Sequence, residues 1–114
     1  MNIDETRRKE LVRYARDKNA RQSSFSAAAP CEWRPFEVLN PETGIPFNDV
    51  SAWNFLADLL ENGHQCETIV LDKPQGQIGY VVLVAGYEPK STIYIKVSLS
   101  KNKINGRSFH LSIY

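Results

Sequence analysis

Polar side chains that can bind phosphate or transfer protons alternate with apolar ones near the end of the chain. In residues 92–99 and 104–113, hydroxyl, amine, phenol and imidazole groups occupy every second position between apolar residues. These polar residues are Tyr94, Lys96, Ser98, Ser108, His110 and Ser112. Because every second side chain of a β-strand lies on the same face, the pattern predicts that all six gather on the open face of a sheet.

These residue types suit metal-independent cleavage of RNA, in which a 2′-hydroxyl attacks the neighbouring phosphate. A base takes the hydroxyl proton, an acid protonates the leaving 5′-oxygen, and fixed cations stabilise charge on the phosphoryl oxygens. His110 is the candidate acid or base, since an unperturbed imidazole titrates near pH ~6.5. Lys96, Arg107 and Lys73 are the candidate cations, and Tyr94 can donate a proton or stack on an unpaired base. The candidate substrate-binding hydroxyls are those of Ser98, Ser108 and Ser112.

Four consecutive runs with strand character position these groups. They are residues 67–72, 78–85, 92–99 and about 104–113. Links of roughly four to seven residues are too short for a parallel crossover, so the strands are expected to pair as antiparallel neighbours. A turn around residues 101–103 joins the last two strands. We expect a register that places Tyr94 opposite His110 and Lys96 opposite Ser108.

A helix is predicted over residues 49–62, directly before the strands. Asn48 or Asp49 supplies its N-cap and Gly63 its C′ position. Its apolar stripe faces the sheet, and Trp53 has no predicted role beyond packing. The members of the stripe are Trp53, Leu56, Leu59 and Leu60.

The beginning of the chain predicts a second helix, over about residues 5–18, with Asp4 as its cap. Its apolar stripe is short, so we expect weak packing or docking on another molecule. Residues 19–30 are small and polar, and predict a linker. The sequence thus predicts an α+β fold, with N-terminal helices followed by a four-stranded antiparallel sheet. Residues 1–30 form a basic helical arm and linker, and residues 31–114 a single α+β domain.

Length, charge and cysteine content limit the possible functions. A chain of 114 residues fits one domain. Its net charge of +1 is the sum of +3 for residues 1–30, −5 for 31–66 and +3 for 67–114, so its basic segments can meet a polyanion. Two cysteines form no disulfide framework, and no stretch approaches the ~18–20 apolar residues of a membrane span. We expect a cytoplasmic protein that needs no cofactor.

Residues 92–112, TIYIKVSLSKNKINGRSFHLS, resemble the closing hairpin of MqsR-type toxins, which belong to the barnase/RelE-like group of small ribonucleases. The shared features are Y-x-K on the third strand and a Ser-Phe pair followed by a basic residue on the last. By this resemblance Tyr94 falls on the toxin's active-site tyrosine, and His110 falls where the toxin has a catalytic lysine. Lys73 stands in for an upstream catalytic lysine, whereas the toxin's active-site glutamine has no counterpart. The resemblance implies a toxin that cuts mRNA and is held inactive by a cognate antitoxin protein.

Other functions fit the same residues. A Tyr-Lys-Ser alternation is typical of any solvated sheet face, so a non-catalytic protein-binding module, such as an antitoxin, immunity or adaptor protein, is the main alternative. RNA binding without cleavage is another. Zinc binding by His64, Cys66, Cys31 and His110 is disfavoured, because their spacing matches no compact ligand pair. No metal site is therefore predicted.

Overall fold

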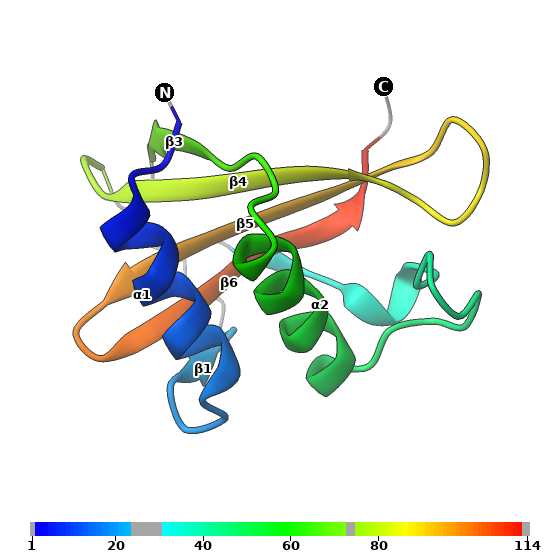
Figure 1. Cartoon of the computed structure of the whole chain (residues 1–114), viewed down its shortest axis with the longest axis horizontal. Helices are drawn as coiled ribbons and strands as arrows, with labels where there is room; N and C mark the ends of the chain where they lie inside the picture. Colours follow the sequence, from blue (N-terminus) through cyan, green and yellow to red (C-terminus); the bar gives the residue numbers. More distant parts are fainter. Residues whose placement is uncertain (1, 24–30, 73–74, 113–114) are drawn as a thin grey trace.

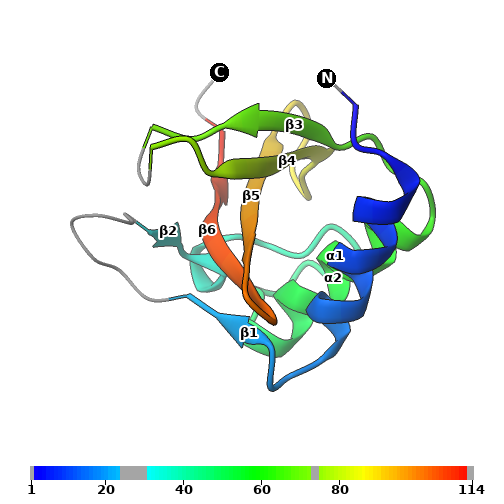
Figure 2. The ribbon, with the colours of Figure 1, turned by 90° about the vertical axis from the view of Figure 1, so that its left-hand side faces the viewer.

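The computed structural model arranges the chain in two layers (Figure 1). It describes residues 2–23, 31–72 and 75–112. One layer is a mixed sheet of six strands in the order β1-β6-β5-β4-β3, with β2 also paired to β6. Helices α1 and α2 form the other layer and cover one face of the sheet (Figure 2). The predicted α+β class is confirmed.

The antiparallel part of the sheet agrees with the sequence prediction. Its strands are β3 (Glu67–Val70), β4 (Ile78–Ala85), β5 (Thr92–Ser100) and β6 (Lys103–Leu111). Each pairs antiparallel with the next along the chain. Tyr94 lies opposite His110 and Lys96 opposite Ser108, which confirms the predicted register. In the turn between β5 and β6, Asn102 takes a positive φ of 59°, which asparagine tolerates.

The prediction of a four-stranded, purely antiparallel sheet is wrong, because two further strands pair with β6. β1 (Arg21–Gln22) and β2 (Glu32–Trp33) both run parallel to β6. β1 lies beside Ile104 and Asn105, and β2 lies beside Ser108 and Phe109. Each has two residues, too few for the alternation by which a strand is detected in sequence. Both cover the outer edge of β6, which the predicted sheet would have left open.

A β-bulge in β6 allows both halves of this strand to bury apolar side chains. Ile104 and Phe109 are five positions apart and would point to opposite faces of a regular strand. Both are nevertheless fully buried in the core. The register shifts between Lys96 and Val97, which makes Arg107 the extra residue of the bulge. This insertion returns Ile104 to the core face.

Next to the bulge, Gly106 makes room for the side chain of Trp33. A Cβ at Gly106 would lie 2.6 Å from the Trp33 ring, closer than real contacts allow. Trp33 stacks on Trp53 of α2 with ring centroids 4.5 Å apart, and it contacts the edge of Phe109 at 5.2 Å. Its Nε1–H donates to Asp49 at 3.2 Å. Trp33 therefore anchors the short strand β2 to the core.

The predicted helix is present as α2 (Asp49–Glu61). The Asn48 side chain accepts a hydrogen bond from the backbone N–H of Ser51 at 2.8 Å, which closes a capping box. Gly63 has a φ of 84°, as expected of a residue that ends a helix. Both predicted ends are confirmed. The fully or almost fully buried members of its core face include Trp53, Leu56 and Leu60.

Helix α1 (Glu5–Arg16) packs more closely than its sequence suggests. Asp4 caps it as predicted, accepting from the backbone N–H of Arg7 at 2.8 Å. Leu11 and Ala15 are fully buried in the same core as α2 and the sheet. The expected weak packing is not observed, because two side chains suffice to seat the helix. The domain boundary at residue 30 stays a prediction.

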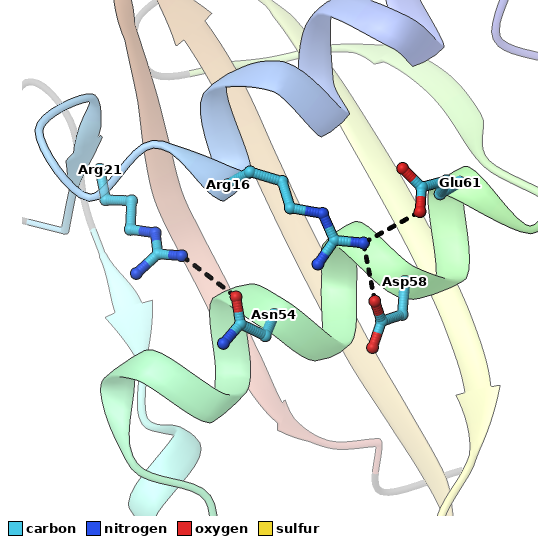
Figure 3. A network of polar contacts seen from close by, with 5 residues as sticks. All are labelled: Arg16, Arg21, Asn54, Asp58 and Glu61. Carbon is cyan, nitrogen blue, oxygen red and sulfur yellow. Dashed lines mark hydrogen bonds and ion pairs between the residues drawn. The ribbon is translucent and has the colours of Figure 1, made fainter.

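Polar contacts add to the packing of α1 on α2. Arg8 donates to the carbonyl oxygens of Leu60 and His64, at 3.1 and 2.7 Å, and so satisfies acceptors at the end of α2. Figure 3 shows a second set, which joins the end of α1 and the start of β1 to α2. These contacts are Arg16 to Asp58 (2.7 Å), Arg16 to Glu61 (3.2 Å) and Arg21 to Asn54 (3.3 Å). Neither helix, nor any other within the described ranges, has the length and apolar character to cross a membrane.

Candidate active site on the open face of the sheet

A groove of about 1010 Å³ lies over the open face of β4, β5 and β6. Five of the predicted site residues line it together with side chains from β2, η1 (Pro35–Glu37) and β4. The predicted ones are Tyr94, Lys96, Ser108, His110 and Ser112. The further lining residues are Glu32, Arg34, Glu37, Val38, Leu83, Thr92 and Leu111. The sheet therefore gathers most of the predicted polar groups in one place.

The strand register orders these side chains in two rows across the sheet. Lys96, Ser108 and Glu32 are direct neighbours on β5, β6 and β2. In the next row Tyr94 and His110 are neighbours on β5 and β6. Adjacent strands lie about 4.8 Å apart, and diagonal neighbours are about 7–8 Å apart. Glu32 and His110 are therefore diagonal neighbours across β2 and β6, and both line the groove.

The imidazole of His110 is held by two contacts, one with a carbonyl oxygen and one with the ring of Tyr94. Its Nδ1 lies 3.0 Å from the carbonyl oxygen of Leu111. A carbonyl only accepts, so in the neutral ring Nδ1 carries the proton and Nε2 carries the lone pair. The ring stacks on Tyr94 with centroids 5.3 Å apart and planes 14° apart. The carbonyl oxygen selects the tautomer, and the stacked phenol ring holds the plane of the imidazole.

The phenol of Tyr94 is kept in its neutral form. Burial raises its pKa above the ordinary value of 10.0, and the nearby negative charge of Glu32 acts in the same direction. At neutral pH Tyr94 therefore carries its proton and can donate a hydrogen bond to a phosphoryl oxygen. One face of its ring meets His110, and its cross-strand neighbour on the other side is Leu83. Its role as a stacking platform for a base stays a prediction.

Three charged residues of the groove were missed from the sequence. Glu32 lies on β2, Arg34 follows it, and Glu37 belongs to η1. The backbone N–H of Arg34 donates to Phe109 at 3.1 Å and so keeps this segment beside β6. The sequence signal for this segment is a short alternation, in which the apolar residues Trp33 and Pro35 follow the charged residues Glu32 and Arg34. With Lys96, the lining holds two acidic and two permanently basic side chains.

Two further predicted site residues, Ser98 and Arg107, lie outside the groove lining. Ser98 is fully buried, and its hydroxyl accepts from Asn105 at 3.4 Å. Arg107, in the bulge, is 7% exposed and does not line the groove. Ser108 lines the groove although it is only 4% exposed. Lys73 lies outside the described residues. Arg107 is the extra residue of the bulge.

The cysteines and the second histidine have separate local roles. Cys31 donates to the carbonyl oxygen of Gly106 at 3.2 Å, and His64 contacts the carbonyl oxygen of Leu83 at 2.8 Å. Burial raises the pKa of the Cys66 thiol to about 11. Both cysteines are free thiols. Within residues 2–23, 31–72 and 75–112, no three His, Cys, Asp or Glu side chains form a group that could hold a metal ion.

The chain was compared with known proteins at three levels. No family model, no curated protein and no solved structure matches it. The chemistry of the groove is therefore judged on its own residues.

Proposed function

We propose that the chain is a metal-independent endoribonuclease that cleaves RNA by attack of the 2′-hydroxyl on the adjacent phosphate. The observation that carries the proposal is the oriented imidazole of His110, stacked on Tyr94, in a groove that also holds a carboxylate and two cations. Acid–base residues on opposite sides of one phosphate are what this reaction requires.

The groove offers a group for each step of the reaction. Glu32 takes the proton of the 2′-hydroxyl as its oxygen bonds to phosphorus. The bond from phosphorus to the 5′-oxygen breaks, and the protonated imidazole of His110 gives its Nε2 proton to that oxygen. Lys96 and Arg34 stabilise the charge on the phosphoryl oxygens, and Tyr94 orients the imidazole. The products are a 2′,3′-cyclic phosphate and a free 5′-hydroxyl, so protons and bonds balance.

The wider biological role is part of the proposal. The resemblance of residues 92–112 to the closing hairpin of MqsR-type toxins supports a toxin that cleaves mRNA and is neutralised by an antitoxin protein. Induced expression is expected to arrest growth, and a neighbouring gene product is expected to restore it. A chain that is harmless at high expression would argue against this role.

Cleavage in the presence of EDTA tests the reaction directly. Purified protein is expected to cut single-stranded RNA and to leave 2′,3′-cyclic phosphate ends. His110→Ala is expected to lower the rate by about 10²-fold or more, the usual contribution of a general acid or base. His64→Ala is the matched control, because His64 lies outside the groove lining. An absence of cleavage, or equal rates for wild type and His110→Ala, would overturn the proposal.

A second candidate function is the non-catalytic binding of a protein partner in the same groove. It is favoured by two apolar residues of the lining, Leu83 and Leu111, which are 54% and 44% exposed. Exposed apolar side chains among polar ones are typical of protein interfaces. If this function is correct, Leu83→Ser abolishes partner binding and no RNA is cleaved.

A further inference from the structure

Two basic segments that are far apart in the sequence meet at the end of the molecule where β5 turns into β6. The Nζ of Lys103, at the start of β6, donates to the carbonyl oxygen of Asn19 at 2.6 Å. Lys18 precedes Asn19, and Lys101 lies in the turn; both are exposed. Figure 2 shows the turn of this hairpin beside β1. We call Lys18, Lys101 and Lys103 the lysine cluster.

The charges around the lysine cluster favour an anion. The nearest acidic residue along the chain is Asp17, whose carboxylate accepts the backbone N–H of Asn19 at 2.9 Å. The groove differs, because Glu32 and Glu37 offset Lys96 and Arg34. A groove with balanced charge attracts a polyanion weakly, whereas three lysines of one sign create a positive potential that draws it in.

The open face of β5 and β6 joins the lysine cluster to the groove. From Lys103 to His110 the strand advances seven residues, about 23 Å at 3.3 Å per residue. Polar side chains occupy the distance between them: Asn105 contacts the hydroxyls of Ser98 and Ser100, at 3.4 and 3.2 Å. Gln22 of β1 donates to Asn105 at 2.7 Å. Ser98 is fully buried, so the groups on this path that a polar chain can meet are Asn105 and the exposed side chains of Ser100 and Gln22.

We propose that the lysine cluster is a second binding site, which holds the sugar–phosphate backbone of single-stranded RNA at a distance from the cleaved bond. The inference rests on the proposed function, because it takes the groove as the site of cleavage. Single-strand binding proteins combine positive charge along the backbone path with polar and aromatic contacts, and the two regions supply these in sequence.

The composition of this surface favours RNA over a protein or a membrane. Large apolar residues are exposed on η1, α2, β3, β4, the far end of β6 and nearby loops, but none of those found among the described residues belongs to the lysine cluster or its turn. Protein interfaces and membrane-bound helices need apolar contact, which this surface lacks in the part of the chain that is described. A phosphate backbone needs only cations and hydrogen bonds.

The test compares two variants that remove the same number of charges. Lys18→Gln/Lys101→Gln neutralises the exposed lysines of the cluster and leaves Lys103 on Asn19. Lys90→Gln/Arg7→Gln is the control, at the β4–β5 loop and at the start of α1. Binding of a labelled single-stranded RNA is followed by fluorescence anisotropy over a range of salt concentrations. All proteins in this binding experiment, including the reference called wild type, carry His110→Ala, so that the RNA stays intact.

We expect the slope of log affinity against log salt to become shallower by about 1.4 in the test variant, since each lost phosphate contact to a single strand is worth about 0.7. The control variant is expected to keep the wild-type slope. Equal slopes for wild type and test variant, or equal losses in test and control, would overturn the inference. Binding of the wild type to anionic lipid vesicles but not to RNA would also overturn it.

A second readout separates this inference from the proposed function. With His110 intact, the test variant is expected to cleave a dinucleotide at the wild-type rate and a long RNA with a several-fold lower kcat/KM. If no protein cleaves RNA but the salt slope still falls, the lysine cluster binds RNA and the proposed cleavage fails. If a dinucleotide and a long RNA are affected equally, the lysines act on the groove and the second site is refuted.

Discussion

The groove and the lysine cluster lie toward opposite ends of the β5–β6 hairpin and differ in how their charges are arranged. In the groove, acidic and basic side chains alternate around a stacked Tyr94–His110 pair. At the hairpin end, lysines from two segments meet, and the nearest acidic residue along the chain, Asp17, accepts a hydrogen bond from the backbone. Mixed charge tunes proton transfer, whereas charge of one sign attracts a polyanion over a longer range. The difference suggests that reaction and attraction are carried by separate regions.

Removal of the Glu32 carboxylate is expected to have the largest effect on cleavage. Glu32→Gln keeps the shape of the side chain but removes the base, so the rate falls by about 10²-fold. RNA affinity does not fall, because the variant also removes a negative charge that repels phosphate. Rate and affinity are measured on the same RNA. Glu42→Gln, an exposed carboxylate outside the groove lining, serves as the control.

An opposite pattern for Glu32→Gln would break the comparison. If affinity falls while the cleavage rate per bound RNA stays unchanged, the carboxylate positions the substrate and is not the base. The groove would then also be a binding surface, and the separation of roles between the two regions would not hold.

The wall of the groove is expected to depend on Gly106. In Gly106→Ala the new Cβ meets the rigid ring of Trp33 at 2.6 Å, so either the ring or β2 must move. Overpacking of this kind typically costs about 2 kcal/mol of unfolding free energy, measured here by urea denaturation. Cleavage is expected to fall as Glu32 shifts with β2, while the salt dependence of RNA binding at the lysine cluster stays unchanged.

A double-mutant cycle identifies the cause of the Gly106→Ala effect. In a Trp33→Leu background the added methyl group meets a smaller side chain, so Gly106→Ala is expected to cost less there. Additive losses in the cycle would show that the methyl group does not act through Trp33. The change in RNA binding then distinguishes a local shift of β2 from a general loss of structure.

The sequence predicts elements with regular patterns and misses those held by tertiary contacts. Helix α2 and the pairing of Tyr94 with His110 follow from periodicity and from short links, and both agree with the structure. β1 and β2 have two residues each, too few to show a period. Both are held by pairing with β6, and β2 is also anchored by the ring of Trp33. Glu32 therefore reaches the groove through a contact that no local pattern encodes.

The bulge marks a second limit of prediction from pattern. Gly106 breaks the alternation of β6, and Ile104 and Phe109 have opposite parity, so the sequence contains a signal for a change of face. Ser98 and Arg107, which the sequence assigns to the site, both lie outside the groove lining. The six-residue polar set was therefore correct near His110 and incorrect toward the turn.

The stacked ring of Tyr94 is expected to contribute less than the carboxylate. Tyr94→Leu removes the aromatic contact with His110, which is worth roughly 0.5–1.5 kcal/mol, so cleavage falls by several-fold to about tenfold. Tyr94→Phe keeps the ring and is expected to recover most of the loss. Equal losses for phenylalanine and leucine would assign the effect to the hydroxyl.

The smallest expected effect is on the ionisation of Tyr94. Burial, and secondly Glu32, raise its pKa above 10.0, so the difference in ultraviolet absorbance between wild type and Tyr94→Phe is expected to titrate above that value. In Glu32→Gln the pKa of Tyr94 falls part of the way, because burial persists while the negative charge is removed. Because the pKa of Tyr94 is raised on folding, its neutral phenol contributes to the free energy of unfolding. This contribution is complete below pH 10.0 and is lost as the pH rises through the pKa of the folded protein. Lys101→Gln is expected to leave this titration unchanged, because Lys101 lies at the other end of β5. A shift of equal size in Lys101→Gln would show that the two regions share one electrostatic environment, and the division of roles between them would then be wrong.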